Sequence, residues 1–206
     1  MTYYFNPLLN TDVIDSPDGK SNWWYYAYYS GGWRENNVFH MDHYPWKEGT
    51  TFVVYTTSED FISDIYEYYR EETFRYEENN GAVIILKVRI IKTEETMVFN
   101  DITVTPHNLR NDLFHEDVIT AIDVIMTLGD LGVISYTLQW YDEISSVDIV
   151  RNYFINSIDD DVSFGTCGFV YETGAERFGF DNHIHIPSDT RVLNSPEYAK
   201  WFWICL

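Results

Sequence analysis

Basic residues are scarce in this chain, and cysteines and long apolar stretches are scarcer still. The 206 residues include 13 Lys and Arg against 33 Asp and Glu, which gives a formal net charge of −20. A field of this sign repels nucleic acid and anionic lipid, so it argues against direct binding of DNA, RNA or a membrane surface. It attracts basic proteins and speeds their association at low salt.

Only two cysteines occur, Cys167 and Cys205. They can pair, but two cysteines do not make the disulfide framework of small secreted domains. The N-terminus lacks a basic segment followed by an apolar run, and Lys87 and Arg89 interrupt the longest apolar stretch, residues 82–91. Neither a signal peptide nor a membrane span is expected, and the sequence predicts a cytoplasmic protein.

The apolar content nevertheless predicts a folded domain. Apolar residues make up 45% of the chain and aromatic residues 18%, which excludes intrinsic disorder despite the charge. Strands interspersed with helices and joined by short turns predict a single α+β domain over residues 1–206, with a mainly antiparallel sheet and two or three amphipathic helices. Aromatic residues mark an N-terminal subregion, residues 1–56.

The expected elements follow from residue patterns and capping signals. Strands are expected over residues 23–29, 51–56, 83–92, 97–104, 133–141, 166–172 and 183–186. Helices are expected over residues 59–74, 108–127 and 146–158, with a short one over 197–203 that follows a Ser-Pro-Glu start signal. Within the strand 83–92, alternation predicts one apolar face made of Ile84, Leu86, Val88 and Ile90.

The negative charge is unevenly distributed along the chain. Residues 1–110 hold 17 acidic and 9 basic side chains, whereas residues 111–176 hold 13 acidic side chains and a single base, Arg151. The last thirty residues carry three of each sign. This asymmetry favours a directed acidic surface over a general effect on solubility.

Two of the predicted helices carry carboxylates on one face. On a wheel of about 100° per residue, the acids of each helix fall within about 60° of one another. An acidic run also follows the third predicted helix. The predicted partner-binding residues are Asp60, Asp64, Glu67 and Glu71 on the first helix, Asp112, Glu116 and Asp123 on the second, and Asp159, Asp160 and Asp161 in the run.

Such stripes resemble the regular charge of a nucleic-acid backbone. The prediction is a non-enzymatic inhibitor or decoy that binds a basic, nucleic-acid-binding partner such as a nuclease, and that needs no cofactor. Anti-CRISPR and anti-restriction proteins of phage follow this charge logic, as do immunity proteins that neutralise nuclease toxins. The plainer alternative is that these are solvated helix faces in a lineage that favours Asp and Glu.

Histidines support a different class of function, a small metal-dependent hydrolase or phosphoesterase. Two short segments carry ligand types for a divalent metal, provided that the segments meet in space. They contain His40, Asp42 and His43 in one segment and His183 and His185 in the other. Neither spacing matches a known zinc signature.

Two further alternatives concern Cys167 and the aromatic segment. As a nucleophile Cys167 needs an adjacent base such as His183 or His185, and the favoured alternative is a buried strand cysteine. The Tyr- and Trp-rich segment 23–33 suits either the core or an interface, so a homodimer joined by aromatic residues is a third functional hypothesis.

Overall fold

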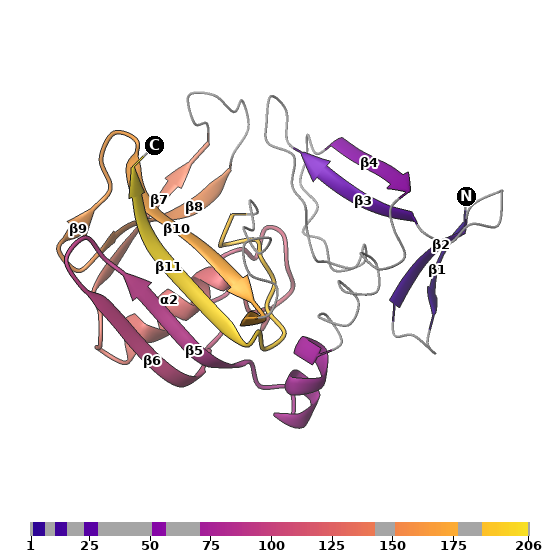
Figure 1. Cartoon of the computed structure of the whole chain (residues 1–206), viewed down its shortest axis with the longest axis horizontal. Coiled ribbons are helices and arrows are strands. Elements are labelled where there is room, and N and C mark those ends of the chain that lie inside the picture. The colour runs from indigo at the N-terminus through magenta and orange to yellow at the C-terminus, as the bar shows by residue number, and fades with distance from the viewer. Residues whose placement is uncertain are drawn as a thin grey trace.

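The computed structural model describes residues 2–6, 11–15, 23–28, 51–56, 71–142, 151–176 and 187–205. These residues form an α+β fold rich in strands, as predicted, with mixed and antiparallel sheets (Figure 1).

The largest sheet has four strands in the order β10-β11-β5-β6. Neighbouring strands are antiparallel except β11 and β5, which run parallel, so the sheet is mixed. A parallel pair needs a long connection, and here more than a hundred residues separate the two strands in sequence. The bounds are Ile84–Ile91 for β5, Thr96–Thr103 for β6, Cys167–Gly174 for β10 and Tyr198–Cys205 for β11.

A second, antiparallel sheet contains β7 (Tyr136–Tyr141), β8 (Asn152–Ile158) and β9 (Asp161–Val162). Its middle strand β8 contacts β10 of the larger sheet. The helix α2 (Ala121–Asp130) lies behind β11 and β5 in Figure 1. Two hairpins complete the described strands, β1 (Thr2–Asn6) with β2 (Thr11–Asp15) and β3 (Trp23–Tyr28) with β4 (Thr51–Thr56).

The core is formed mainly by α2 and the larger sheet. Each fully buried aliphatic or aromatic side chain contributes about 1.5–3 kcal/mol relative to exposure. The core side chains that are fully buried include Ile122, Val124, Ile125 and Leu128 of α2, Ile85, Val88 and Ile90 of β5, and Trp201 of β11. In the β3–β4 hairpin, Tyr25 is also buried, with its ring centroid 5.1 Å from that of Phe52.

Most of the predicted strands are confirmed. Strands occupy the expected positions near residues 23–29, 51–56, 83–92, 97–104, 133–141 and 166–172. The predicted strand 183–186 lies outside the described residues. Of the predicted helix 59–74, only residues 71–74 are described, and they belong to a helical segment that continues to residue 78.

The predicted helix 108–127 is wrong over its first half, because α2 begins only at Ala121. Residues 109–113 form turns instead. Asn108 and Asp117 adopt positive φ angles of 55° and 70°, which an α-helix does not tolerate. The Asn108 side chain accepts a hydrogen bond from the Asp117 N–H, which stabilises this irregular loop.

Over the residues that the structure describes, two other predicted helices are strands, and residues 146–150 of the predicted helix 146–158 lie outside those residues. Residues 152–158 form β8 and residues 198–205 form β11. Instead of capping a helix, the buried Ser195 hydroxyl accepts a hydrogen bond from the Ile84 N–H and donates one to the Ala82 carbonyl. Pairing with β5 and β10 therefore overrides the local helix-start signal.

The predicted apolar face of β5 is only half right. Val88 and Ile90 are buried as expected, but Ile85 is buried while Leu86 is 44% exposed. The break lies opposite Asp101 of β6, which has a φ angle of 53° and sits between the paired residues Asn100 and Ile102. The pairing is interrupted at this position, and the register is the same on both sides of it.

Candidate functional site

Two acidic turns meet at one corner of the fold. The β8–β9 turn carries Asp159 and Asp160, and the β5–β6 turn lies against it. Thr93 donates to Asp161 from its N–H (2.9 Å) and from its hydroxyl (2.6 Å), and the Lys92 ammonium contacts Asp159 at 3.1 Å. These contacts gather a group of five carboxylates, the acidic corner: Glu94, Glu95, Asp159, Asp160 and Asp161.

These contacts shift the pKa values of Asp159, Asp161 and Lys92 in the direction that favours their charged forms. Partial burial would raise the pKa of Asp159, but hydrogen bonds from Ser135 and Lys92 outweigh it and lower that pKa. Hydrogen bonds from the Thr93 hydroxyl and N–H lower the pKa of Asp161. The hydrogen bond to Glu95 raises the pKa of Lys92. Asp159 and Asp161 therefore keep their negative charges to lower pH than ordinary aspartates do.

The carboxylates of the corner divide into two roles. Asp159 and Asp161 hold the two turns together, whereas Glu94 and Asp160 are exposed and the Glu95 side chain is 61% exposed. The exposed acids present negative charge to solvent on hairpin turns. Glu94 and Glu95 were not predicted as partner-binding residues, although two adjacent acids between two predicted strands are a sign of a charged hairpin turn.

A groove of about 420 Å³ opens beside this corner, between the second sheet and the β10–β11 hairpin. We call it the aromatic groove. Its lining side chains are uncharged, with Gln139 and Asn156 as the amides. The Tyr141 and Phe154 rings pack edge to face at 5.5 Å from β7 and β8, and Phe169 of β10 lies across the groove.

A short turn and a disulfide form one wall of the groove. Phe164 and Cys167 exchange backbone hydrogen bonds of 3.0 and 2.8 Å around Gly165, whose φ angle of 56° suits a tight hairpin turn. Cys167 is bonded to Cys205, its partner in the β10–β11 register. Cys167 lies on a strand, as the favoured alternative has it, but it is half-buried, and a disulfide-bonded sulfur is no nucleophile.

The second predicted acidic stripe does not exist, because its helix begins only after two of its three residues. Asp112 pairs with Arg110 through two contacts of 2.9 Å, and Glu116 lies exposed in the loop. Asp123 is 2% exposed and accepts hydrogen bonds from Thr120 and from the His107 N–H and ring. Its carboxylate secures the start of α2 and is closed to a partner.

The first predicted stripe falls largely beyond the described part of the chain. Asp60, Asp64 and Glu67 lie outside it, and Glu71 is half-buried at the start of the described helical segment.

The predicted metal site also lies outside the described residues, since none of His40, Asp42, His43, His183 and His185 is among them. Within the described ranges, no three His, Cys, Asp or Glu side chains are grouped so as to hold a metal ion. In the same ranges, no helix has the length and apolar character that a membrane crossing requires.

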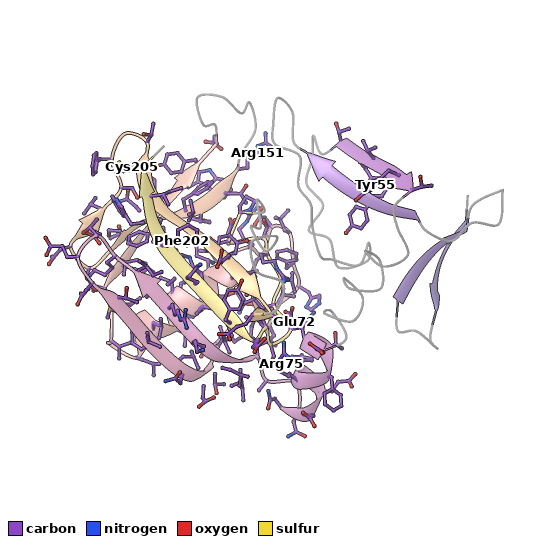
Figure 2. All side chains as sticks on the ribbon, in the orientation of Figure 1. Tyr55, Glu72, Arg75, Arg151, Phe202 and Cys205 are labelled. Carbon is purple, nitrogen blue, oxygen red and sulfur yellow. A yellow bond between two sulfur atoms is a disulfide. The ribbon has the colours of Figure 1, made fainter. Side chains whose placement is uncertain are left out.

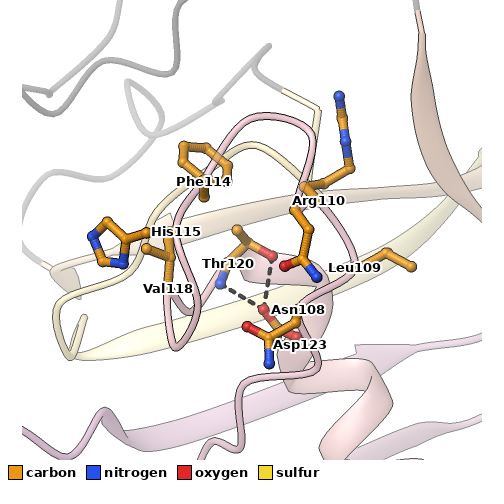
Figure 3. Close-up of a pocket in the computed structure, with 9 residues that line it drawn as sticks. Asn108, Leu109, Arg110, Phe114, His115, Val118, Thr120 and Asp123 are labelled. Atoms are coloured by element: carbon orange, nitrogen blue, oxygen red, sulfur yellow. Dashed lines mark hydrogen bonds between the residues drawn. The ribbon is translucent and has the colours of Figure 1, made fainter.

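A small cavity near the start of α2 is too small for a ligand. Its volume is about 10 Å³, room for about one water molecule. Figure 3 shows Arg110, His115 and Thr120 around it, with the Asp123 carboxylate bonded to Thr120.

Several charged groups are buried for structural reasons. Asp189 accepts from Arg110 (2.6 Å), from Asn152 (2.7 Å) and from the Tyr153 N–H (2.8 Å). Glu72 accepts from the Asn194 N–H at 2.8 Å, and the Arg75 side chain donates to the Ser195 carbonyl.

Figure 2 shows Glu72 and Arg75 on the helical segment, beside the start of β11. Together with Asp189, these groups fasten residues 187–195 to the core.

No protein-family model matches this chain, and neither a curated protein nor a solved structure matches it.

Proposed function

We propose that this protein is a non-enzymatic inhibitor that binds a basic, nucleic-acid-binding protein and occupies the surface used for DNA or RNA. The observation that carries the proposal is the meeting of two acidic turns in the acidic corner of a chain with a net charge of −20. Carboxylates held on hairpin turns attract Lys and Arg side chains and speed encounter at low salt.

A nuclease is the partner class that this charge favours. Its nucleic-acid groove is basic, and an acidic protein can compete with the phosphate backbone for the same Lys and Arg residues. The role is that of an anti-CRISPR or anti-restriction protein, or of an immunity protein against a nuclease toxin. It requires neither a cofactor nor a catalytic residue.

The proposal also includes the cytoplasmic compartment that the sequence predicts. Reductants there keep most thiols reduced. The bond between Cys167 and Cys205 is therefore expected to persist in that compartment only if its reduction potential lies below about −300 mV.

Inhibition of DNA cleavage tests the proposal directly. Three purified nucleases serve as probes: an RNA-guided nuclease, a restriction endonuclease and a nuclease toxin. At about 50 mM salt we expect the protein to inhibit at least one of them, and at about 200 mM salt we expect at least tenfold weaker inhibition, because screening shortens the range of charge attraction.

Charge reversal locates the surface. Glu94 and Asp160 are both exposed, so the E94K/D160K variant should fold and lose most of the inhibition. The control E77K/E78K makes the same charge change at two exposed positions of the helical segment 71–78 and should inhibit normally. Cleavage by all three nucleases at full rate, or equal loss of inhibition in both variants, would contradict the proposal.

A further inference from the structure

The aromatic groove has the size and the lining of a binding site. Its volume of about 420 Å³ falls within the range of about 300–1,000 Å³ that is typical of ligand sites. Within the described chain, none of its lining side chains is Asp, Glu, Lys or Arg, so its interior does not recognise its occupant by charge. It suits an apolar group.

Aromatic rings line two sides of the groove. Tyr141 and Phe154 form one side, and Phe164 and Phe169 are the other aromatic residues of its lining. The Phe164 and Phe169 rings also pack on Trp203, outside the lining, with centroid distances of 6.2 and 5.1 Å. Phe164 is 67% exposed at the mouth of the groove. Exposed aromatic residues beside a pocket are typical of the few contacts that dominate binding energy in protein interfaces.

The groove is also preformed. The Ser163 N–H donates to the Asn156 carbonyl at 2.7 Å, which fixes the turn against β8, and the Cys167–Cys205 disulfide fixes it to β11. Binding to a rigid site loses less conformational entropy than binding to a loop that must first become ordered.

Charge complementarity identifies the occupant. Asp161 of the acidic corner begins β9, and Ser163 of the groove directly follows the end of that strand, two residues later, which is a span of about 7 Å for extended backbone. In an extended peptide, side chains two positions apart are separated by the same distance. A peptide with an apolar residue in the groove can therefore place a basic residue two or three positions away at the corner.

We infer that the aromatic groove binds a bulky apolar side chain of the basic partner. This inference rests on the proposed function. Lys or Arg residues beside that side chain in the partner pair with Glu94 and Asp160. The groove supplies the apolar centre of the interface and the corner supplies its charged rim, the division found in protein interfaces generally.

A labelled peptide tests the inference with the oxidised protein. The probe is a fluorescein-labelled heptapeptide with a central Phe, a Gly on each side and two Lys at each end. A second probe has Ala in place of Phe. Fluorescence anisotropy should show that the Phe peptide binds at least about tenfold more tightly than the Ala peptide, which corresponds to about 1.4 kcal/mol.

Two matched protein variants locate the contact. F164A should weaken binding of the Phe peptide by about tenfold and leave binding of the Ala peptide unchanged. F74A removes the same side chain from an exposed position outside the groove, where Phe74 is 58% exposed, and should change neither affinity by more than about twofold.

The outcomes separate the two proposals. Salt-dependent binding of both peptides with equal affinity, weakened by E94K/D160K but not by F164A, would overturn the groove inference and leave the inhibitor proposal standing. Failure of both peptides to bind, with a nuclease still inhibited, would overturn the groove inference alone, and failure of the nuclease test as well would overturn both proposals. A dimer in sedimentation that F164A abolishes, with no peptide bound, would assign the groove to a second copy of this chain and also overturn the inference.

Discussion

Arg110 and Asp189 are 79 positions apart in the sequence, yet the Arg110 Nη1 and Asp189 Oδ2 atoms lie 2.6 Å apart in the interior. The two side chains are 4% and 0% exposed. The other carboxylate on the same guanidinium, Asp112, has a side chain that is 58% exposed. One arginine thus joins a buried ion pair to a surface ion pair, and the two pairs should differ in their effect on stability.

The D189A variant should lower the free energy of unfolding by about 3–5 kcal/mol, because it leaves the buried Arg110 Nη1, the Asn152 amide and the Tyr153 N–H without their acceptor. D112A is the matched control and should cost less than about 1 kcal/mol, since it removes a solvent-screened pair. Denaturant titration of both variants measures the difference. If both variants lost the same free energy of unfolding, the buried Arg110–Asp189 pair would not be more stabilising than the Arg110–Asp112 pair.

The local hairpins of the fold could be predicted from sequence, whereas strand pairs between distant parts of the chain could not. The strand 83–92 and its antiparallel partner were predictable because β-branched residues and a short turn specify a hairpin locally. Residues 198–205 carried an equally clear local signal for a helix, Ser195-Pro196-Glu197, and still form a strand. Their parallel pairing with β5 is a long-range contact that no local pattern encodes.

The acidic corner and the aromatic groove were predictable only in part, because both depend on contacts between distant parts of the chain. The acidic run at residues 159–161 stood out by composition, but its neighbours Glu94 and Glu95 join it only through the Thr93–Asp161 hydrogen bonds. The groove includes residues of β10 and β11, which a long-range strand pairing and the Cys167–Cys205 disulfide bring together. The helical wheel failed for Asp112, Glu116 and Asp123 because it assumed a helix over residues that form a loop.

The disulfide itself should contribute strongly to stability. Cys167 and Cys205 are separated by 38 residues, and a cross-link over such a loop stabilises a protein by about 2–4 kcal/mol, mainly by restricting the unfolded chain. The C167S/C205S variant should lose that amount relative to the oxidised protein. Fully reduced wild-type protein is the control and should be about as stable as the variant. Two thiols reactive in protein purified without reductant would show that the bond is absent.

Asp161 of the acidic corner should make the free energy of unfolding depend on pH in the acidic range, at and below the pH at which an ordinary aspartate titrates. The pKa of Asp161 is lowered in the folded state, so the unfolded chain binds its proton more readily. The resulting stability is present above the ordinary pKa of about 4 and is lost as the pH falls through the lower folded value.

The D161N variant should therefore be less stable than wild type at pH 6, and the difference should shrink steadily below pH 4. Urea titrations across that range measure it. D160N is the matched control, because the adjacent Asp160 is exposed and has no hydrogen bond within the described residues. A constant difference between D161N and wild type at every pH would contradict the assignment.

Gly129 should resist a substitution that normally favours a helix. In an exposed helix interior, Gly→Ala stabilises by up to about 1 kcal/mol. At Gly129 the added Cβ would lie 2.2 Å from Cε1 and 2.6 Å from Cδ1 of the Tyr136 ring, so G129A should instead destabilise by about 1–3 kcal/mol. A double-mutant cycle checks the cause: in a Y136A background the ring is gone, and G129A should then be neutral or stabilising. If G129A remained destabilising by the same amount in that background, contact with Tyr136 would not be the reason for glycine at this position.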